Sequence, residues 1–193
     1  MLDEGTADIV DATMAIVDRS SGACGGRPAD VTLVEAWLGH RNDTSALQGL
    51  TRKGFVVDPM EIAAPWSALE SLFDDVRRAI MAVPHARAAT CHLSHSYADG
   101  ACLYFTFAAT PPPEEIESTY VALWDAGQRA VLAGGGNLSH HHGVGVNRGR
   151  FMAEALGPAH GVLAAIKSTL DPNGIMNPGK LGLPTPFGTV PWP

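Results

Sequence analysis

A predicted β-hairpin constrains the fold of this chain more than any other feature. Residues 88–96 and 101–109 are strand-like, and Tyr97-Ala98-Asp99-Gly100 joins them through an Asp-Gly pair, a strong signal for a hairpin turn. Because side chains alternate along a strand, Tyr104 is expected to point away from the core. The apolar face, predicted to cover helices, carries Leu103, Phe105 and Phe107, and the opposite face carries Cys102, Tyr104 and Thr106.

Helical patterns flank this hairpin. Ser67 and Glu70 have the spacing of a capping box. Residues 55–62 before them read as a strand, with Pro59 at a sheet edge or a bulge. Residues 111–113 begin another helix, which the glycines at 134–136 end. The order of elements predicts an α+β fold, a ferredoxin-like antiparallel sheet with helices on one face. The apolar stripe of the first helix is Leu69, Leu72, Phe73, Val76 and Ile80.

Further helices are predicted toward both ends of the chain. Apolar residues recur at helical spacing through residues 9–18, and 31–38 suggests a short helix after a loop at 19–29. A C-terminal helical segment is expected, with helices at 151–156 and 158–170. Residues 182–193 read as an irregular tail.

Composition narrows the classes of function. The formal net charge is −7, and no cluster of Lys or Arg offsets it, so no nucleic-acid partner is expected. The three cysteines are odd in number and widely spaced, which is typical of a reducing compartment. There is no apolar run of about 18 residues and no secretory signal. The chain is expected to be cytoplasmic.

Three consecutive histidines, 140–142, lie between Gly134–Gly136 and Gly143-Val144-Gly145. Neighbouring side chains in a turn point in different directions, so the run is not expected to close on one metal ion. Glycines allow a backbone to approach a ligand closely, and imidazole suits proton transfer or contact with a phosphate. The run predicts a ligand-facing loop, with a merely solvated run as the alternative.

A second group of metal-ligand types is interpreted as structural. On a strand, Cys91 and His95 face one side while His92 faces the other. No metal site is therefore predicted anywhere in the chain.

Four stretches carry a resemblance to a known family. They resemble the alkylglycerone-phosphate (alkyl-dihydroxyacetone-phosphate) synthase branch of FAD-linked oxidases of the vanillyl-alcohol oxidase type. Most members of that superfamily carry Glu-His-Gly where this chain has His-His-His-Gly, and the resemblance covers almost the whole chain. The stretches are Phe-Val-Val-Asp-Pro-Met-Glu-Ile-Ala-Ala-Pro-Trp at 55–66, Tyr-Ala-Asp-Gly-Ala-Cys-Leu-Tyr-Phe at 97–105, Ser-His-His-His-Gly-Val-Gly at 139–145, and Asp-Pro-Asn-Gly-Ile-Met-Asn-Pro-Gly-Lys at 171–180.

The resemblance implies an arrangement of domains. It implies that residues 1–133 are a substrate-binding cap domain lacking its beginning. Residues 134–181 would be the His-rich loop and a flavin-proximal helical segment, followed by the tail at 182–193. FAD would be bound mainly by an N-terminal domain that is absent, because no glycine run here follows a strand and opens a helix. The chain is expected to be a truncated form or one subunit of a split enzyme, inactive as an isolated fragment.

The resemblance also implies roles for individual residues. Arg41 aligns with the arginine that receives the substrate phosphate, and a planar guanidinium suits that contact. Tyr104 aligns with the family's general acid/base. His141 is expected nearest to substrate and flavin, as a catalytic and cofactor-contacting residue. The supporting predictions are His140 and His142 for substrate and Asn177 for the flavin ring region.

The implied reaction exchanges the acyl group of acyl-dihydroxyacetone phosphate for a fatty alcohol, a step of ether lipid synthesis. A lipid phosphate and a fatty alcohol are the expected small-molecule partners, with a transient membrane-surface contact and a homodimer or separate FAD-domain subunit as open expectations. One alternative is an FAD-linked 2-hydroxy-acid oxidoreductase, against which the three histidines argue. The other is a non-catalytic cap-domain remnant.

Overall fold

The computed structural model describes residues 3–43 and 45–188. The chain divides into two compact units, Met1–Ala46 and Leu47–Pro193. The first unit contains α1 (Ala7–Ala23) and α2 (Thr32–His40), which confirms the two N-terminal helices. The loop predicted from residue 19 is wrong over its first part, because α1 continues until the backbone approaches Gly25, whose φ is 81°. A short helix that was not predicted, α3 (Ser45–Thr51), spans the boundary between the units.

The second unit is built on a three-stranded antiparallel sheet with strand order β1-β3-β2. The strands are β1 (Val56–Pro65), β2 (Ala86–Ser94) and β3 (Gly100–Ala109). The hairpin is confirmed, since β2 pairs with β3 and the Tyr97 N–H donates to the carbonyl of Gly100 over 2.8 Å. Pro59 lies in edge strand β1, as predicted.

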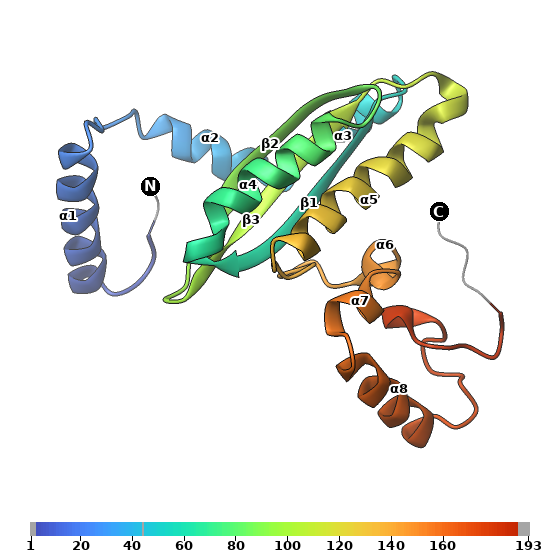
Figure 1. Cartoon of the computed structure of the whole chain (residues 1–193). Helices are drawn as coiled ribbons and strands as arrows, with labels where there is room; N and C mark the ends of the chain where they lie inside the picture. Colours follow the sequence, from blue (N-terminus) through green and yellow to red (C-terminus); the bar gives the residue numbers. More distant parts are fainter. Residues whose placement is uncertain (1–2, 44, 189–193) are drawn as a thin grey trace. The chain divides into compact units, whose positions relative to one another are not determined.

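Two helices, α4 (Trp66–Met81) and α5 (Ile116–Ala133), run along one face of this sheet (Figure 1). The α+β prediction is therefore confirmed. The capping box is wrong, because β1 runs directly into α4, whose N-cap is Pro65 and makes no side-chain capping bond. Ser67 then lies inside the first turn. The core between helices and sheet includes the fully buried residues Met60, Ile62, Leu72, Phe105, Phe107 and Leu123.

The glycines that end α5 allow the chain to pass close to α4. A Cβ on Gly134 would lie 2.4 Å from Cδ2 of Leu72, so only a glycine fits there without a shift. The chain then reaches the free edge of β1, where Ala63 and Asn137 form an antiparallel bridge. Their two N–H···O bonds measure 2.7 and 3.3 Å. This bridge lies where a fourth strand would pair, and it brings the histidine run to the sheet.

The C-terminal segment is helical, as predicted. It contains α6 (Gly145–Gly149), which was not predicted, and α7 (Met152–Leu156) and α8 (Ala159–Leu170), which were. Two single turns of 3-10 helix, η1 (Pro113–Glu115) and η2 (Lys180–Gly182), complete the described elements. Within residues 3–43 and 45–188, no helix has the length and apolar character needed to cross a membrane. The domain boundary predicted after residue 133 stays a prediction, and the last five residues of the tail lie outside the described range.

Candidate active site

The sheet face opposite α4 and α5 carries a row of polar side chains. Antiparallel register places Glu61 of β1 directly opposite Tyr104 of β3, and Tyr104 directly opposite His92 of β2. Residues directly opposite in such a sheet share a face, and the rings of His92 and Tyr104 are stacked with centroids 4.8 Å apart. The predicted orientation of Tyr104, away from the helices, is thus confirmed. Cys102, two residues before Tyr104 on β3, lies on the same face and nearer to the hairpin turn.

Glu61 binds the segment that contains the three histidines, residues 139–142, to this face. Its side chain is fully buried, and it accepts hydrogen bonds from the Ser139 hydroxyl over 2.6 Å and from the His142 N–H over 3.0 Å. The His140 N–H donates to its other carboxylate oxygen. Hydrogen bonds to a charged group are among the stronger ones in proteins. One carboxylate therefore fixes the backbone on both sides of His141.

Arg148 of α6 supplies the opposite charge. Its guanidinium lies 3.4 Å from the Glu61 carboxylate, is itself buried, and donates to the carbonyls of Leu138 and Gly143 over 2.8 and 3.1 Å. The same guanidinium lies over the ring of Trp124, 5.0 Å from its centroid. A buried carboxylate needs such partners, because an unpaired buried charge costs several kcal/mol. The buried ion pair of Glu61 and Arg148 therefore holds the backbone of residues 138–143 through hydrogen bonds from both partners.

Neither Glu61 nor Arg148 belongs to a sequence motif that predicts a role at this site. One signal was present: Glu61 stands between Met60 and Ile62 in an apolar strand, and a charge in such a place requires a partner. The identity of that partner depends on a contact 87 residues along the chain.

The histidine rings gather above Tyr104. The ring of His141 lies nearly parallel to that of Tyr104, with centroids 6.1 Å apart, and the ring of His142 meets it edge-on at 5.4 Å. Nδ1 of His140 lies 3.0 Å from Nδ1 of His141, and Nε2 of His140 lies 3.0 Å from the hydroxyl of Tyr97. The structure therefore brings together Tyr104 and all three histidines of the run. Among the described residues, no direct hydrogen bond joins Tyr104 to a histidine ring.

The pKa values of Tyr104 and His141 are shifted in opposite directions. Burial, followed by the charges of Asp58 and Glu61, raises the pKa of Tyr104 above its ordinary value. Desolvation, followed by the charge of the neighbouring His142, lowers the pKa of His141. At neutral pH the phenol accordingly holds its proton and the His141 imidazole is neutral. The pair presents a proton donor beside a proton acceptor.

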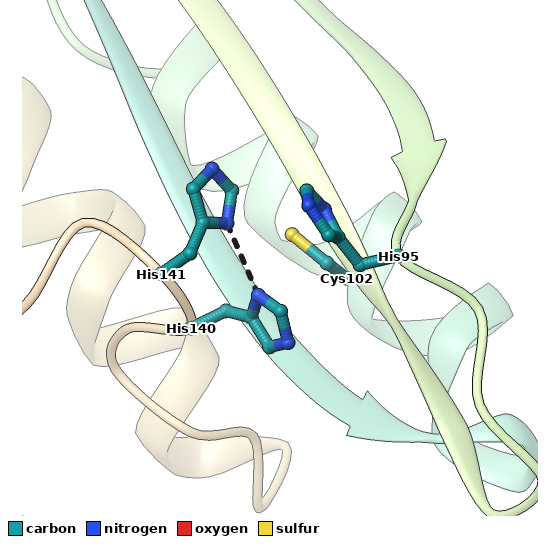
Figure 2. A group of neighbouring side chains, drawn as sticks. All are labelled: His95, Cys102, His140 and His141. Carbon is teal, nitrogen blue, oxygen red and sulfur yellow. Dashed lines mark hydrogen bonds between the residues drawn. The ribbon is translucent and has the colours of Figure 1, made fainter.

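His95 joins the same cluster, which the strand-alternation argument did not predict. Its ring centroid lies 5.1 Å from that of His140 and 4.5 Å from that of His141 (Figure 2). The expectation that His95 shares a face with Cys91 is wrong, because β2 ends at Ser94 and His95 has a φ of 49°. Cys91 packs instead against the core.

Two other predicted site residues have contacts of their own. Arg41 belongs to the first unit, where its guanidinium lies over Trp37, 5.2 Å from the ring centroid. Asn177 is exposed with a φ of 45°, and its carbonyl accepts a bond from the Lys180 N–H. No hydrogen bond or ring contact of the described chain links Asn177 to the histidine cluster. The roles predicted for Arg41 and Asn177 stay predictions.

Comparison with known proteins places this chain in a family. The family described as "FAD linked oxidases, C-terminal domain" matches residues 5–181. The chain is 30% identical over 165 residues to the Escherichia coli K12 protein named "Uncharacterized FAD-linked oxidoreductase YgcU", covering 79% of this chain and 34% of that protein. It is 34% identical over 136 residues to the alkyldihydroxyacetonephosphate synthase of Dictyostelium discoideum, covering 67% and 22%.

A solved structure shares the fold. A structure titled "alkyldihydroxyacetonephosphate synthase in P1" aligns with a TM-score of 0.56 and 22% identity over 89% of this chain and 29% of that one. The chain thus spans about a third or less of the length of these relatives. The family match, which runs through the hairpin, the histidine run and the Asn-Pro-Gly-Lys segment, shows that this chain belongs to the FAD-linked oxidases and carries their C-terminal domain.

Proposed function

We propose that this chain forms the substrate side of an FAD-dependent enzyme that exchanges the acyl group of acyl-dihydroxyacetone phosphate for a fatty alcohol. The observation that carries the proposal is the placement of Tyr104 beside His141, with opposite shifts of their pKa values, on a face that a buried carboxylate organises. Similarity to alkyldihydroxyacetonephosphate synthases over two thirds of the chain supports this choice of reaction.

The residues present fit one part of FAD and not another. The exposed His141 and the half-buried Tyr104 offer planar rings and a phenol hydroxyl to the edge of a flavin ring. No described glycine run suits the diphosphate, which is commonly held where a strand passes through glycines into a helix. Gly25 follows α1, and Gly134–Gly136 follow α5, so both runs come after helices. When bound, FAD would supply the electrophilic ring of the reaction.

The protein's own residues would bind, orient and move protons. Neutral His141 accepts the proton from C1 of the substrate ketone, while the Tyr104 hydroxyl donates a hydrogen bond to the ketone oxygen, which gains negative charge as that proton leaves. Tyr104 then gives its proton to the departing carboxylate and recovers one from the arriving alcohol. His140 is held by Glu61 through its backbone and by Tyr97 through its ring, which keeps its neighbour His141 in place. Fixing these groups before the substrate arrives reduces the entropy lost at the transition state.

Arg41 is proposed to bind the substrate phosphate, and this role is tested by a conservative change. Arg41→Lys keeps the charge but loses the planar fork, so we expect KM for the phosphorylated ketone to rise by the equivalent of about 1–3 kcal/mol. The measurement is steady-state kinetics on phosphorylated and dephosphorylated substrates, with the chain reconstituted with a flavin-binding domain and FAD. Arg27→Lys, another exposed arginine of the first unit, serves as control. If Arg41→Lys treats both substrates as the parent does, Arg41 is not the phosphate ligand.

FAD retention by these 193 residues is a second test. Because the described glycine runs do not suit the diphosphate, we expect purified protein to be colourless and the fluorescence of added FAD to stay unchanged. The check is a fluorescence titration followed by gel filtration. A yellow preparation with one FAD per chain would mean that this chain contains a complete flavin site.

A further inference from the structure

Four metal-ligand side chains meet beside the turn of the hairpin. They are His95 after β2, Cys102 on β3, and His140 and His141 from the histidine segment, and one ligand atom of each lies within 4.8 Å of every other (Figure 2). Only two of the three consecutive histidines take part. The run itself does not close on one point, but two of its members and two residues of the hairpin do.

We propose that His95, Cys102, His140 and His141 form a four-ligand site for Zn²⁺. Three imidazole nitrogens and one thiolate make a donor set of the mixed type that zinc takes in tetrahedral geometry. Carboxylates are not part of the cluster, which disfavours Mg²⁺ and Ca²⁺, since both prefer oxygen ligands.

The spacing of the ligand atoms suits a tetrahedral ion. Zn–N bonds of about 2.0–2.1 Å and a Zn–S bond of about 2.3 Å place ligand atoms roughly 3.3–3.6 Å apart. Nδ1 of His140 and Nδ1 of His141 are 3.0 Å apart. The widest pair, at up to 4.8 Å, must close by roughly 1 Å. His141 is exposed and can turn about its side-chain bonds, whereas Cys102 is fully buried and does not move to meet the ion.

In His140 and His95, one ring nitrogen already has a hydrogen-bond partner, which leaves the other nitrogen for the ion. Nε2 of His140 lies 3.0 Å from the Tyr97 hydroxyl, which leaves Nδ1 for the ion. Nδ1 of His95 lies 2.6 Å from the hydroxyl of Ser94, which leaves Nε2. Metal-bound histidines are commonly oriented by such a partner on the other ring nitrogen. This arrangement distinguishes the cluster from a chance gathering of surface histidines.

The thiol must lose its proton on binding. Burial, followed by the charge of Glu61, raises the pKa of Cys102 to about 11, so the thiol is protonated at neutral pH. A coordinating metal ion deprotonates a thiol outright. An ion at this site would also occupy the lone pair with which His141 is proposed to accept a proton. Zinc binding and proton transfer by His141 therefore exclude each other, and zinc is expected to inhibit.

The test uses Zn²⁺ and Co²⁺ alone and needs neither FAD nor substrate, so its outcome is independent of the proposed reaction. We expect one Zn²⁺ per chain by calorimetric titration. Co²⁺ should give the intense visible bands of a tetrahedral site and a near-ultraviolet charge-transfer band from the thiolate. Cys102→Ser should abolish the charge-transfer band. His95→Asn should weaken Zn²⁺ binding by more than about 100-fold, since losing even an outer partner costs about 10–100-fold.

Matched controls separate the site from general metal binding. His85 precedes β2 as His95 follows it, has a φ of 67°, and lies about 30 Å away along the strand. Asn tolerates positive φ, so His85→Asn and His95→Asn both place an asparagine in a left-handed backbone conformation that it adopts readily. Cys91→Ser removes a thiol of the neighbouring strand. Both controls should bind Zn²⁺ as the parent does.

Three results with the parent protein and Cys102→Ser would overturn the proposal. They are a Zn²⁺ stoichiometry well below one, a weak octahedral Co²⁺ spectrum, and a thiolate band that survives in Cys102→Ser. Because Cys102 is buried and its replacement can disturb folding, His95→Asn at an exposed position provides the deciding comparison. Equal Zn²⁺ affinity of folded His95→Asn and His85→Asn would exclude the site.

Discussion

Tyr104→Phe should slow exchange of the substrate C1 proton with solvent by about 10²–10⁴, the usual contribution of a positioned acid or base. The change removes only the hydroxyl, and the ring that stacks on His92 at 4.8 Å remains. Folding should therefore survive while the proton donor is lost. The raised pKa of Tyr104 means that the parent enzyme carries this proton throughout the neutral range.

His141→Ala should slow the same exchange to a similar degree. Residues that act as a unit lose their effect together, so the double variant should be little slower than either single one. The measurement is proton exchange at C1, followed by NMR, with the chain reconstituted with a flavin-binding domain and FAD. Tyr120→Phe is the matched control, because Tyr120 lies on α5, its hydroxyl donates to Asp58, and it makes no ring contact or hydrogen bond with a histidine among the described residues. Parental exchange in Tyr104→Phe would show that Tyr104 is only a packed strand residue.

Glu61→Ala should lower the free energy of unfolding by about 3–5 kcal/mol, the cost of removing one partner from a buried ion pair. The change leaves the Arg148 guanidinium buried without its carboxylate and leaves the N–H groups of His140 and His142 without an acceptor. We expect the histidine segment to detach from β1 as well, with loss of the cluster that His141 shares with Tyr104.

Urea denaturation of the parent and of Glu61→Ala measures the difference in their free energies of unfolding. The matched control is Glu154→Ala, since Glu154 pairs with Arg129 at 3.5 Å while both side chains are more than half exposed; such pairs contribute about 0–1 kcal/mol. Glu61→Gln with Arg148→Met should recover part of the stability, because an apolar replacement removes the unpaired charge. If Glu61→Ala and Glu154→Ala destabilise the protein equally, the buried pair does not hold the loop.

Sequence alone determined the local elements and their order. Alternation and helical periodicity act over a few residues, so they determined the hairpin at 97–100, the helices α4, α5, α7 and α8, and the direction in which Tyr104 points. The same local rules predicted a ligand-facing loop at the three histidines, but they do not predict which strand of the sheet that loop contacts. The resemblance to a known family supplied the candidate roles, which local patterns do not contain.

Only the tertiary structure decided what meets at the site. Glu61 reaches Ser139 across 78 residues and Arg148 across 87, and these contacts depend on the strand register and on the return of the chain to the free edge of β1. His95 turns toward His140 and His141 because its backbone leaves the strand with a positive φ, where alternation no longer applies. Long-range packing, rather than any pattern along the chain, assembled the carboxylate, the phenol, the thiol and the imidazoles on one face.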